Sequence, residues 1–140
     1  MKTPAQQDAE HIWQILVTLV MDTRGDWKRK VTEATGLPFS RIRALTRIED
    51  GPRMLGELAY DMNIDAPAAT VIINDLEARG LVERRAHPQN RRAKLVSLSA
   101  EGRKMVEAVN RVTDPPPALL TALSAQELAE LRRIFEGDVS

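Results

Sequence analysis

Residues 79–102 read RGLVERRAHPQNRRAKLVSLSAEG and carry the strongest structural signal in the chain. Two runs of strand-like composition, 81–85 and 93–98, enclose a polar tip at 87–92 that contains Pro88. Up to position 94 the stretch holds one acid, Glu83, against six basic residues: Arg79, Arg84, Arg85, Arg91, Arg92 and Lys94. The pattern predicts a β-hairpin whose guanidinium-rich tip suits a DNA backbone and minor groove, where the phosphates concentrate negative potential.

Two helices are predicted at the start of the chain. Residues 8–31 carry apolar residues at helical spacing. This stripe is broad for a lone surface helix, so we expect it to contact a partner as well as its own core. A second helix begins near Pro38 and continues through an apolar series at helical spacing, namely Phe39, Ile42, Leu45 and Ile48.

A helix–turn–helix pattern lies directly before the hairpin. Residues 54–63 form a short amphipathic segment, and a turn at 64–65 leads to a second one at 66–79. Asp65 is a good N-cap for that second helix. Gly80 is a natural residue to end it, since glycine accepts the left-handed conformation.

The rest of the chain is predicted to be helical. Ser99 caps a helix that runs to about Thr113, and the triple proline 115–117 ends it. Ser124 and Glu127 form a capping box for a final helix to about residue 135. The predicted order is α-α-α-α-β-β-α-α, a mainly α fold with a small β-hairpin wing.

The segment 55–102 resembles the DNA-binding core of the MarR family of bacterial transcription regulators. The wing of that family runs roughly Asp-x-Arg, then a hydrophobic strand that ends in Leu-Thr, then a helix. The matching residues here are 90–92, Asn-Arg-Arg, and 96–99, Val-Ser-Leu-Ser. The resemblance extends more weakly over 36–48 and the flanking helices, so it covers most of the chain.

This resemblance implies a single MarR-type unit over residues 1–140. Its winged helix–turn–helix DNA-binding region would span 36–98. The N- and C-terminal helices, 1–35 and 99–140, would form a dimerisation region. Independently, the C-terminal part is rich in large apolar residues, which fits pairing with a second copy. Packing of this tail on its own subunit is the alternative.

The second helix of the helix–turn–helix is expected to read bases in the major groove. Its inward residues are Ala69, Ile72, Ile73 and Leu76, and its DNA-binding residues are Ala68, Thr70, Val71 and Asn74. Asparagine can bond adenine through two hydrogen bonds, so these residues favour an A/T-containing half-site. MarR-like proteins often carry arginine where Val71 stands, which shifts specificity toward the wing and DNA shape. The alternative is that Val71 is partly buried and Asn74 merely solvated.

The wing residues expected to bind DNA are Asn90, Arg91, Arg92 and Lys94. The resemblance places Arg92 at the wing-tip arginine that enters the minor groove, although Arg91 could take that role or bind a phosphate. Asn90 stands where the family has an aspartate that holds the arginine. An uncharged acceptor should weaken this clamp by about 1 kcal/mol.

Other arginines are candidates for phosphate contact, and each has solvation as its alternative. They are Arg41, Arg53, Arg79 and Arg84. The formal net charge of the chain is zero, but the basic residues concentrate in its middle. Such a distribution indicates one DNA-facing surface on an otherwise balanced molecule.

Several function classes are made improbable by what the sequence contains. It has no cysteine, which excludes disulfides, thiolate metal sites and thiol redox sensing. Its two histidines are far apart, and no phosphate loop, nucleophile motif or metal spacing occurs, so we expect no enzyme, cofactor or metal. No apolar run is long enough for a membrane span and no signal peptide is evident, so the expected location is cytoplasmic.

The predicted function is that of a sequence-specific regulator, most often a repressor, which binds double-stranded DNA as a homodimer on a pseudo-palindromic operator. The resemblance also implies a small-molecule effector; residues considered for it are His11, Trp13, Trp27, Phe39 and Arg43, none of which is assigned to a site. Two alternatives stay open. One is a winged helix that engages a protein partner, and the other is an architectural DNA binder without sequence preference.

Overall fold

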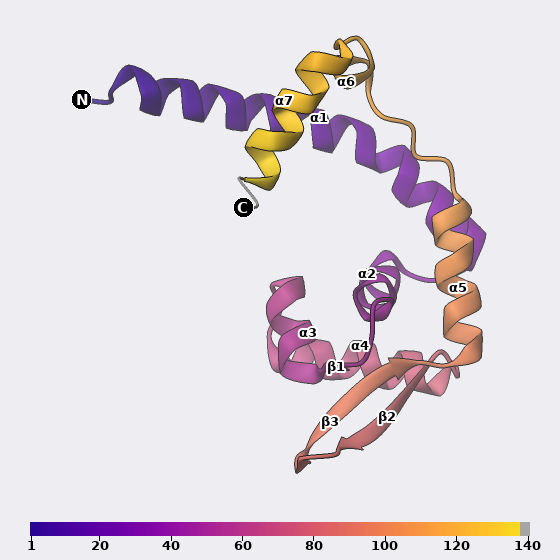
Figure 1. Ribbon diagram of the computed structural model, residues 1–140. Helices are drawn as coiled ribbons and strands as arrows, with labels where there is room; N and C mark the ends of the chain where they lie inside the picture. The colour runs from indigo at the N-terminus through magenta and orange to yellow at the C-terminus, as the bar shows by residue number, and fades with distance from the viewer. Residues whose placement is uncertain (138–140) are drawn as a thin grey trace. The chain divides into compact units, whose positions relative to one another are not determined.

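The computed structural model describes residues 1–137 and divides the chain into two compact units. One unit joins Met1–Gly25 to the segment that begins at Asp114, and the other is Asp26–Thr113. The elements, labelled in Figure 1, are α1 (Pro4–Thr35), α2 (Phe39–Ile48), β1 (Arg53–Met54), α3 (Leu55–Met62), α4 (Ala66–Ala78), β2 (Val82–His87), β3 (Asn90–Leu98), α5 (Ala100–Arg111), α6 (Ala118–Thr121) and α7 (Ala125–Glu136).

The core of the Asp26–Thr113 unit is built from the apolar faces of α2 to α5 and the base of the hairpin. The four inward residues predicted on α4 are all buried: Ala69, Ile72, Ile73 and Leu76. They meet buried side chains of α2 and α3, including Ile42, Leu45, Leu58 and Met62. Because one face of α4 is committed to this core, its opposite face is left exposed.

The predicted helix ends are confirmed where their side-chain chemistry is local. The Asp65 carboxylate accepts the amide of Ala68 at 2.7 Å and so caps α4. Gly80 follows α4 with a φ of 76°, the left-handed conformation expected of a C′ residue. Ser124 and Glu127 form the predicted capping box, with bonds of 2.9 and 3.1 Å between each side chain and the other's backbone amide.

A three-stranded antiparallel sheet forms the wing, with the strand order β1-β3-β2. Arg53 and Met54 of β1 pair with Val96 and Leu95 of β3. Strand β1 is absent from the sequence-based prediction, because two residues show no alternation that a sequence pattern could reveal. The fold class is the predicted one, mainly helical with a small β-hairpin wing.

The hairpin is longer than its apolar runs indicate. β2 extends to His87 and β3 begins at Asn90, so the predicted six-residue tip shrinks to a two-residue turn. The pairing partners shift at the end: Ala86 faces Lys94, but His87 faces Asn90. Residues 91–93 therefore have no counterpart and bulge out of the ladder. Backbone pairing continues into the polar residues because it does not depend on side-chain hydrophobicity.

The helices outside the winged region differ from the prediction in two ways. Helix α1 begins four residues earlier and ends four residues later than the predicted 8–31, because polar residues at both ends continue the helix without an apolar stripe. The four-residue helix α6, which follows the prolines, is also absent from the prediction. Its few residues are too short a segment for a periodicity argument.

Most of the exposed large apolar residues belong to the terminal unit. Trp13 and Phe135 are about two-thirds exposed, at 65% and 66%. The others in this unit are Ile12, Ile15, Val20, Met21, Leu119, Leu128 and Ile134, with Met1 at the chain start. Neither α6 nor α7 contains a buried residue. This unit therefore presents an apolar surface that its own described residues do not cover.

None of the helices described over residues 1–137 combines the length and apolarity that crossing a membrane requires.

Candidate nucleic-acid interface

The exposed face of α4 carries the four residues predicted to read bases. Asn74 is exposed and Val71 is 60% exposed, while Ala68 and Thr70 are partly exposed. The exposure of Val71 rules out the alternative that it is partly buried. The Thr70 hydroxyl donates to the carbonyl of Ala66 at 3.0 Å.

Asn74 is engaged rather than merely solvated. The guanidinium of Arg84, on β2, donates to the Asn74 Oδ1 atom. Arg84 Nε also lies 3.7 Å from Glu77 Oε2, and its side chain is only 23% exposed. Arg84 is thus held between two residues of α4, a contact that links the helix to the hairpin.

A second cluster centres on Asp75. Its carboxylate accepts from Arg41 Nε at 2.9 Å and from Arg79 Nε at 3.1 Å. The hydrogen bond from Arg41 is the main reason that the pKa of Asp75 lies below 3.8; desolvation opposes this effect, and Arg79 lowers the pKa further. Asp75 therefore orients two arginines at the side of the exposed α4 face.

Arg53 is also paired within the protein. Its guanidinium contacts Asp61, lies 3.7 Å from Glu57 and donates to the Arg47 carbonyl at 3.4 Å. Each of the four arginines proposed for phosphate contact therefore has a carboxylate nearby. The spacing of Asp75 and Arg79 could have revealed one such pair, since residues four apart meet on a helix. Arg53 and Glu57 are also four residues apart, but they lie on different elements. The remaining pairs join residues that are too far apart in the sequence to leave a local signal.

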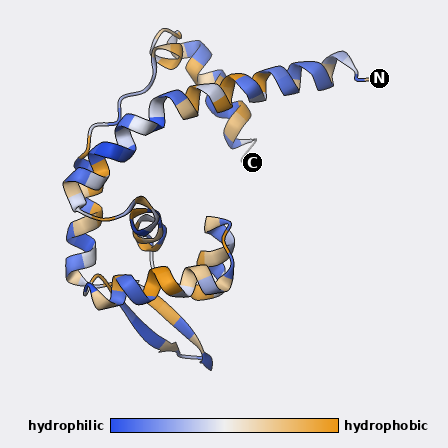
Figure 2. Cartoon of the chain, turned by 180° about the vertical axis from the view of Figure 1, so that it is seen from behind, coloured by the Kyte–Doolittle hydropathy of each residue, from blue (hydrophilic) through white to orange (hydrophobic). Residues whose placement is uncertain are grey.

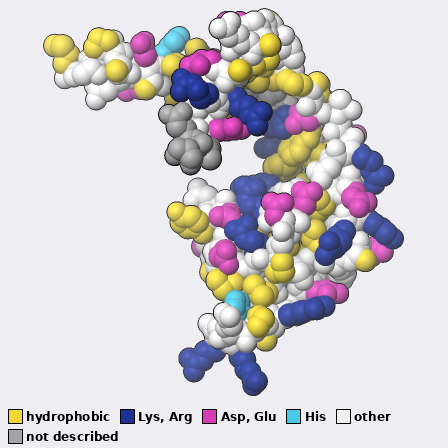
Figure 3. All heavy atoms as spheres, viewed as in Figure 1, with side chains coloured by type: hydrophobic (Ala, Val, Ile, Leu, Met, Phe, Trp, Pro, Cys, Tyr) yellow, Lys and Arg dark blue, Asp and Glu magenta, His cyan; other side chains and the backbone are white. Residues whose placement is uncertain are grey.

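The tip of the wing has a different character. Arg91, Arg92 and Lys94 are exposed, and none of them makes an ion pair with another residue of the described 1–137 segment. Figure 3 shows Lys and Arg side chains projecting at the end of the hairpin, and Figure 2 shows the same end as hydrophilic. The tip thus presents cations that form no ion pair with carboxylates of the described residues.

Asn90 organises this tip through the backbone. Its Oδ1 atom accepts the amide N–H of Arg92 at 3.2 Å, whereas the sequence-based expectation concerned the arginine side chain. On the opposite strand, His87 Nδ1 accepts the amide of Gln89 at 3.0 Å. These two local bonds shape the turn and leave the guanidinium groups of residues 91 and 92 available.

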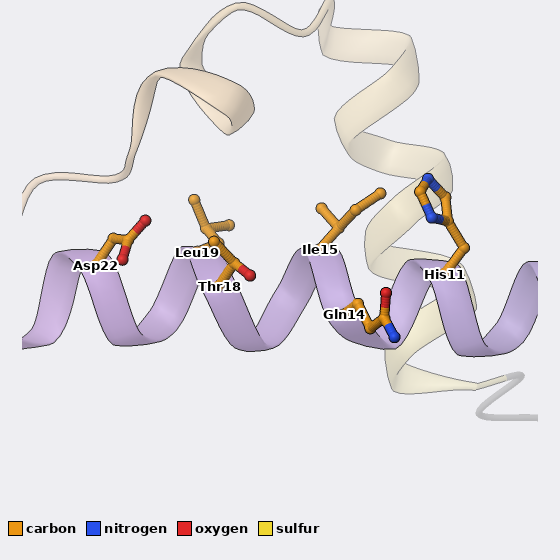
Figure 4. Close-up of a pocket in the computed structure, with 6 residues that line it drawn as sticks. All are labelled: His11, Gln14, Ile15, Thr18, Leu19 and Asp22. Carbon is orange, nitrogen blue, oxygen red and sulfur yellow. The ribbon is translucent and has the colours of Figure 1, made fainter.

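The residues considered for an effector belong to both units: His11 and Trp13 to the terminal unit, and Trp27, Phe39 and Arg43 to the Asp26–Thr113 unit. Trp27 and Phe39 pack edge to face at 5.7 Å beside the core, and Arg43 donates to the Met62 carbonyl at 3.2 Å. His11 lies at a groove of about 380 Å³ on α1, drawn in Figure 4. All residues that line this groove come from that single helix: His11, Gln14, Ile15, Thr18, Leu19 and Asp22. It is an open helix face, not an enclosed cavity.

The arrangement of α3, α4 and the β2–β3 hairpin defines a winged helix–turn–helix protein (Figure 1). Residues 40–94 match the model of the MarR family. This match confirms the resemblance to the MarR family that segment 55–102 showed.

Two relatives are named as regulators of transcription. The chain is 30% identical over 107 residues to the HTH-type transcriptional regulator YdgJ of Bacillus subtilis, covering 76% of this chain and 63% of that protein. It is 36% identical over 74 residues to an HTH-type transcriptional regulator of Mycobacterium leprae, covering 52% of each. The chain therefore spans only half to two-thirds of the length of these relatives. Neither is named as an enzyme, in agreement with the expectation of a non-enzymatic protein.

The fold is also found in a solved DNA complex. A cysteine-to-serine variant of MarR from E. coli, crystallised with operator DNA, superposes with a TM-score of 0.62 at 23% identity, over 89% of this chain and 94% of that one. At this identity the likeness establishes the fold alone.

Proposed function

We propose that this protein is a sequence-specific DNA-binding transcription regulator that acts as a homodimer on a pseudo-palindromic operator. The observation that carries the proposal is the pairing of two features in one unit. An exposed α4 face with the dimensions to enter a major groove is followed by a wing whose tip cations have no carboxylate partners within residues 1–137.

The two features divide the work of recognition. Ala68, Thr70, Val71 and Asn74 would contact base edges. Arg91 and Arg92 would approach the minor groove and the phosphates beside it, with Lys94 on the adjoining strand. Cations without a competing carboxylate gain more from a phosphate than paired ones, because no ion pair has to be broken.

The arginines that form ion pairs within the protein would make additional phosphate contacts. Arg41, Arg53, Arg79 and Arg84 are held near the α4 face by Asp75, Asp61 and Glu77. A phosphate that replaces or joins such a carboxylate keeps the arginine in the same place. The carboxylates therefore preserve orientation at a cost in affinity, which favours selective over indiscriminate DNA binding.

Dimerisation is proposed from the terminal unit. Its uncovered apolar residues on α1 and α7 suit a second copy of the same surface. Two copies would present two α4 helices to successive major grooves, and two half-sites are what tight operator binding usually requires. The E. coli complex joins operator DNA to a protein of this fold, which supports the same kind of partner here.

A repressor released by a small effector is the further part of this proposal. A ligand can release DNA only if it binds better to a dimer geometry with the wrong spacing of the two α4 helices. The cytoplasm is the expected location of such a regulator.

The test is a binding titration of purified protein with DNA from its own upstream region and with a scrambled duplex, at two salt concentrations. We expect preferential binding by two protomers per site. The logarithm of the affinity should fall with that of the salt concentration by about 0.9 for each phosphate contact. Equal binding to both duplexes would favour an architectural role, and no binding at low salt would favour a protein partner.

Two substitutions separate the roles of wing and helix. Arg92→Ala should weaken binding to every duplex and reduce the salt slope by roughly one contact. Asn74→Ala should mainly relax the preference at one base pair, by roughly 1–3 kcal/mol of discrimination. Arg85→Ala is the matched control for the wing, since Arg85 is paired with Glu83 at 3.3 Å. Unchanged affinity and specificity in both test variants would refute this docking.

A further inference from the structure

The contact between Arg84 and Asn74 joins a residue of the wing strand to the centre of the exposed α4 face. Asn74 Oδ1 accepts from the Arg84 guanidinium, and Arg84 is restrained from its other side by Glu77, 3.7 Å from Nε. Its side chain is 23% exposed, whereas Arg91 and Arg92 are exposed at the tip. Arg84 is therefore positioned against α4 before any DNA arrives.

The chemistry of this contact sets the orientation of the Asn74 amide. A guanidinium group has hydrogen-bond donors and no acceptor, so the carbonyl end of the amide must face it. The NH₂ end is then turned away from Arg84. Asn74 consequently presents its NH₂ donors to a ligand, while its oxygen is turned toward a charged partner and already accepts from it.

We infer that Arg84 is a positioning residue that sets the base preference of Asn74, an inference that rests on the proposed DNA-binding function. Adenine is read by asparagine through two bonds, which require both the amide oxygen and the NH₂ group. With the oxygen oriented toward Arg84, the donor half is the part of the amide that turns to a base edge. Asn74 then suits an acceptor on the base edge: N7 or O6 of guanine, N7 of adenine or O4 of thymine.

This assignment differs from what the residue type of Asn74 alone suggests. An unrestrained asparagine favours adenine over guanine, because it can accept from the N6 amino group. A donor-only asparagine gains nothing from that amino group and disfavours cytosine, whose edge presents an N4 donor. Arg84 thereby acts on specificity through Asn74 and need not touch a base itself.

The test begins by selecting binding sites from random duplexes with the wild type and with Asn74→Ala. The position at which Asn74→Ala flattens the preference is the base pair that Asn74 reads. At that position, Arg84→Met should shift the preference toward adenine, while Arg84→Lys, which keeps a charged donor, should retain the wild-type preference. Glu77→Gln is the control, because it removes the ion pair but leaves the Arg84–Asn74 bond.

A second measurement uses the wild-type protein with altered DNA, so its result does not depend on whether the variants fold. Replacing adenine at that position by purine, which lacks the N6 amino group, should change the affinity less than about twofold, since a donor-only asparagine makes no bond to that group. Its replacement by 7-deazaadenine should reduce the affinity several-fold. A loss of roughly 5- to 100-fold on removal of the amino group, as expected for a two-bond contact, would overturn the inference.

The failure of this inference is distinct from that of the proposed function. Arg84→Met that lowers affinity for all duplexes equally, with an unchanged preference, would make Arg84 a phosphate contact only and would overturn the inference alone. Absence of any base preference in the wild type would overturn the proposed function, and this inference with it.

Discussion

The packing of α5 against the hairpin base requires glycine at position 102. A Cβ atom at this position would lie 2.0 Å from the carbonyl oxygen of Leu81 and 3.3 Å from a methyl group of Leu98. The oxygen belongs to the backbone and accepts the amide of Ser99 at 3.0 Å, so it cannot move without disturbing the start of α5. The absence of a side chain at Gly102 is what lets α5 approach the hairpin base.

We therefore expect Gly102→Ala to lower the free energy of unfolding by about 1–3 kcal/mol, the usual cost of overpacking. Gly56→Ala in α3 is the matched control, because a Cβ atom there meets nothing within 4 Å. That control should be neutral or more stable by roughly 0.5–1 kcal/mol, since alanine favours helices. Urea unfolding of both variants measures the difference; equal stability of the two would contradict the packing argument.

Asp75 makes the stability of the fold depend on pH in the acidic range. Its carboxylate accepts from Arg41 and Arg79, and its pKa is lowered below 3.8, first by the Arg41 hydrogen bond. A carboxyl whose pKa is lower in the folded state stabilises the fold above its unfolded pKa. This contribution disappears as the pH falls through the folded pKa.

The expected result is that wild type is more stable than Asp75→Asn at neutral pH and that the two converge below about pH 4. The measurement is the free energy of unfolding from about pH 2 to about pH 7, a range that spans the titration of carboxyl groups. Asp50→Asn provides the control, since Asp50 makes no ion pair with other residues of segment 1–137. A difference between wild type and Asp75→Asn that persisted at the lowest pH would argue against the ion-pair origin.

Among the elements, the wing depends on Asn90 for the shape of its tip. The bulge at residues 91–93 interrupts the β2–β3 ladder, so the tip relies on side-chain bonds. Asn90 Oδ1 supplies one of them to the Arg92 amide at 3.2 Å. A well-shaped tip lowers the entropy lost when the arginines dock.

Asn90→Ala should therefore loosen the tip by about 0.5–1.5 kcal/mol, the net worth of one hydrogen bond. Faster hydrogen exchange of the Arg92 amide and weaker DNA binding are the expected signs. Asn90→Asp keeps the acceptor oxygen and should preserve the protection of that amide. If the alanine variant exchanged no faster than the aspartate variant, Asn90 would have no role in shaping the tip.

Across the whole chain, the two units differ in how much apolar surface they leave exposed to solvent. The Asp26–Thr113 unit contains every buried apolar residue of the described chain, whereas the terminal unit leaves Trp13 and Phe135 about two-thirds exposed. Apolar area left in water is unfavourable by roughly 25 cal/mol per Å². A second copy that covers this surface would therefore stabilise the terminal unit more than the winged unit.

Phe135→Asp should accordingly favour the monomer and weaken operator binding, while the circular dichroism of the winged unit stays unchanged. Gln126→Asp adds the same charge at an exposed polar position of α7 and serves as the control. Sedimentation velocity over a range of concentrations measures the result. A Phe135→Asp protein with the mass and affinity of the wild type would remove α7 from the proposed interface.

Features with local signals can be predicted from the amino-acid sequence of this chain. Asp65, Gly80 and the Ser124–Glu127 box mark helix ends within a few residues, and the apolar spacing of α4 identifies its buried face. The basic hairpin that follows a helix–turn–helix is likewise sufficient to indicate the resemblance to the MarR family. Such features are predictable because their partners lie three or four residues away or recur with a fixed period.

The arrangement of the exposed face, in contrast, follows from the packing of the folded chain. Arg41 meets Asp75 from a different helix, Arg84 reaches Asn74 from a strand, and the two-residue β1 exists only because β3 pairs with it. These contacts leave no periodic trace, because their geometry depends on how α2, α4 and the hairpin pack around one core. The residue types at the site were therefore readable in advance, but their partners and orientations were not.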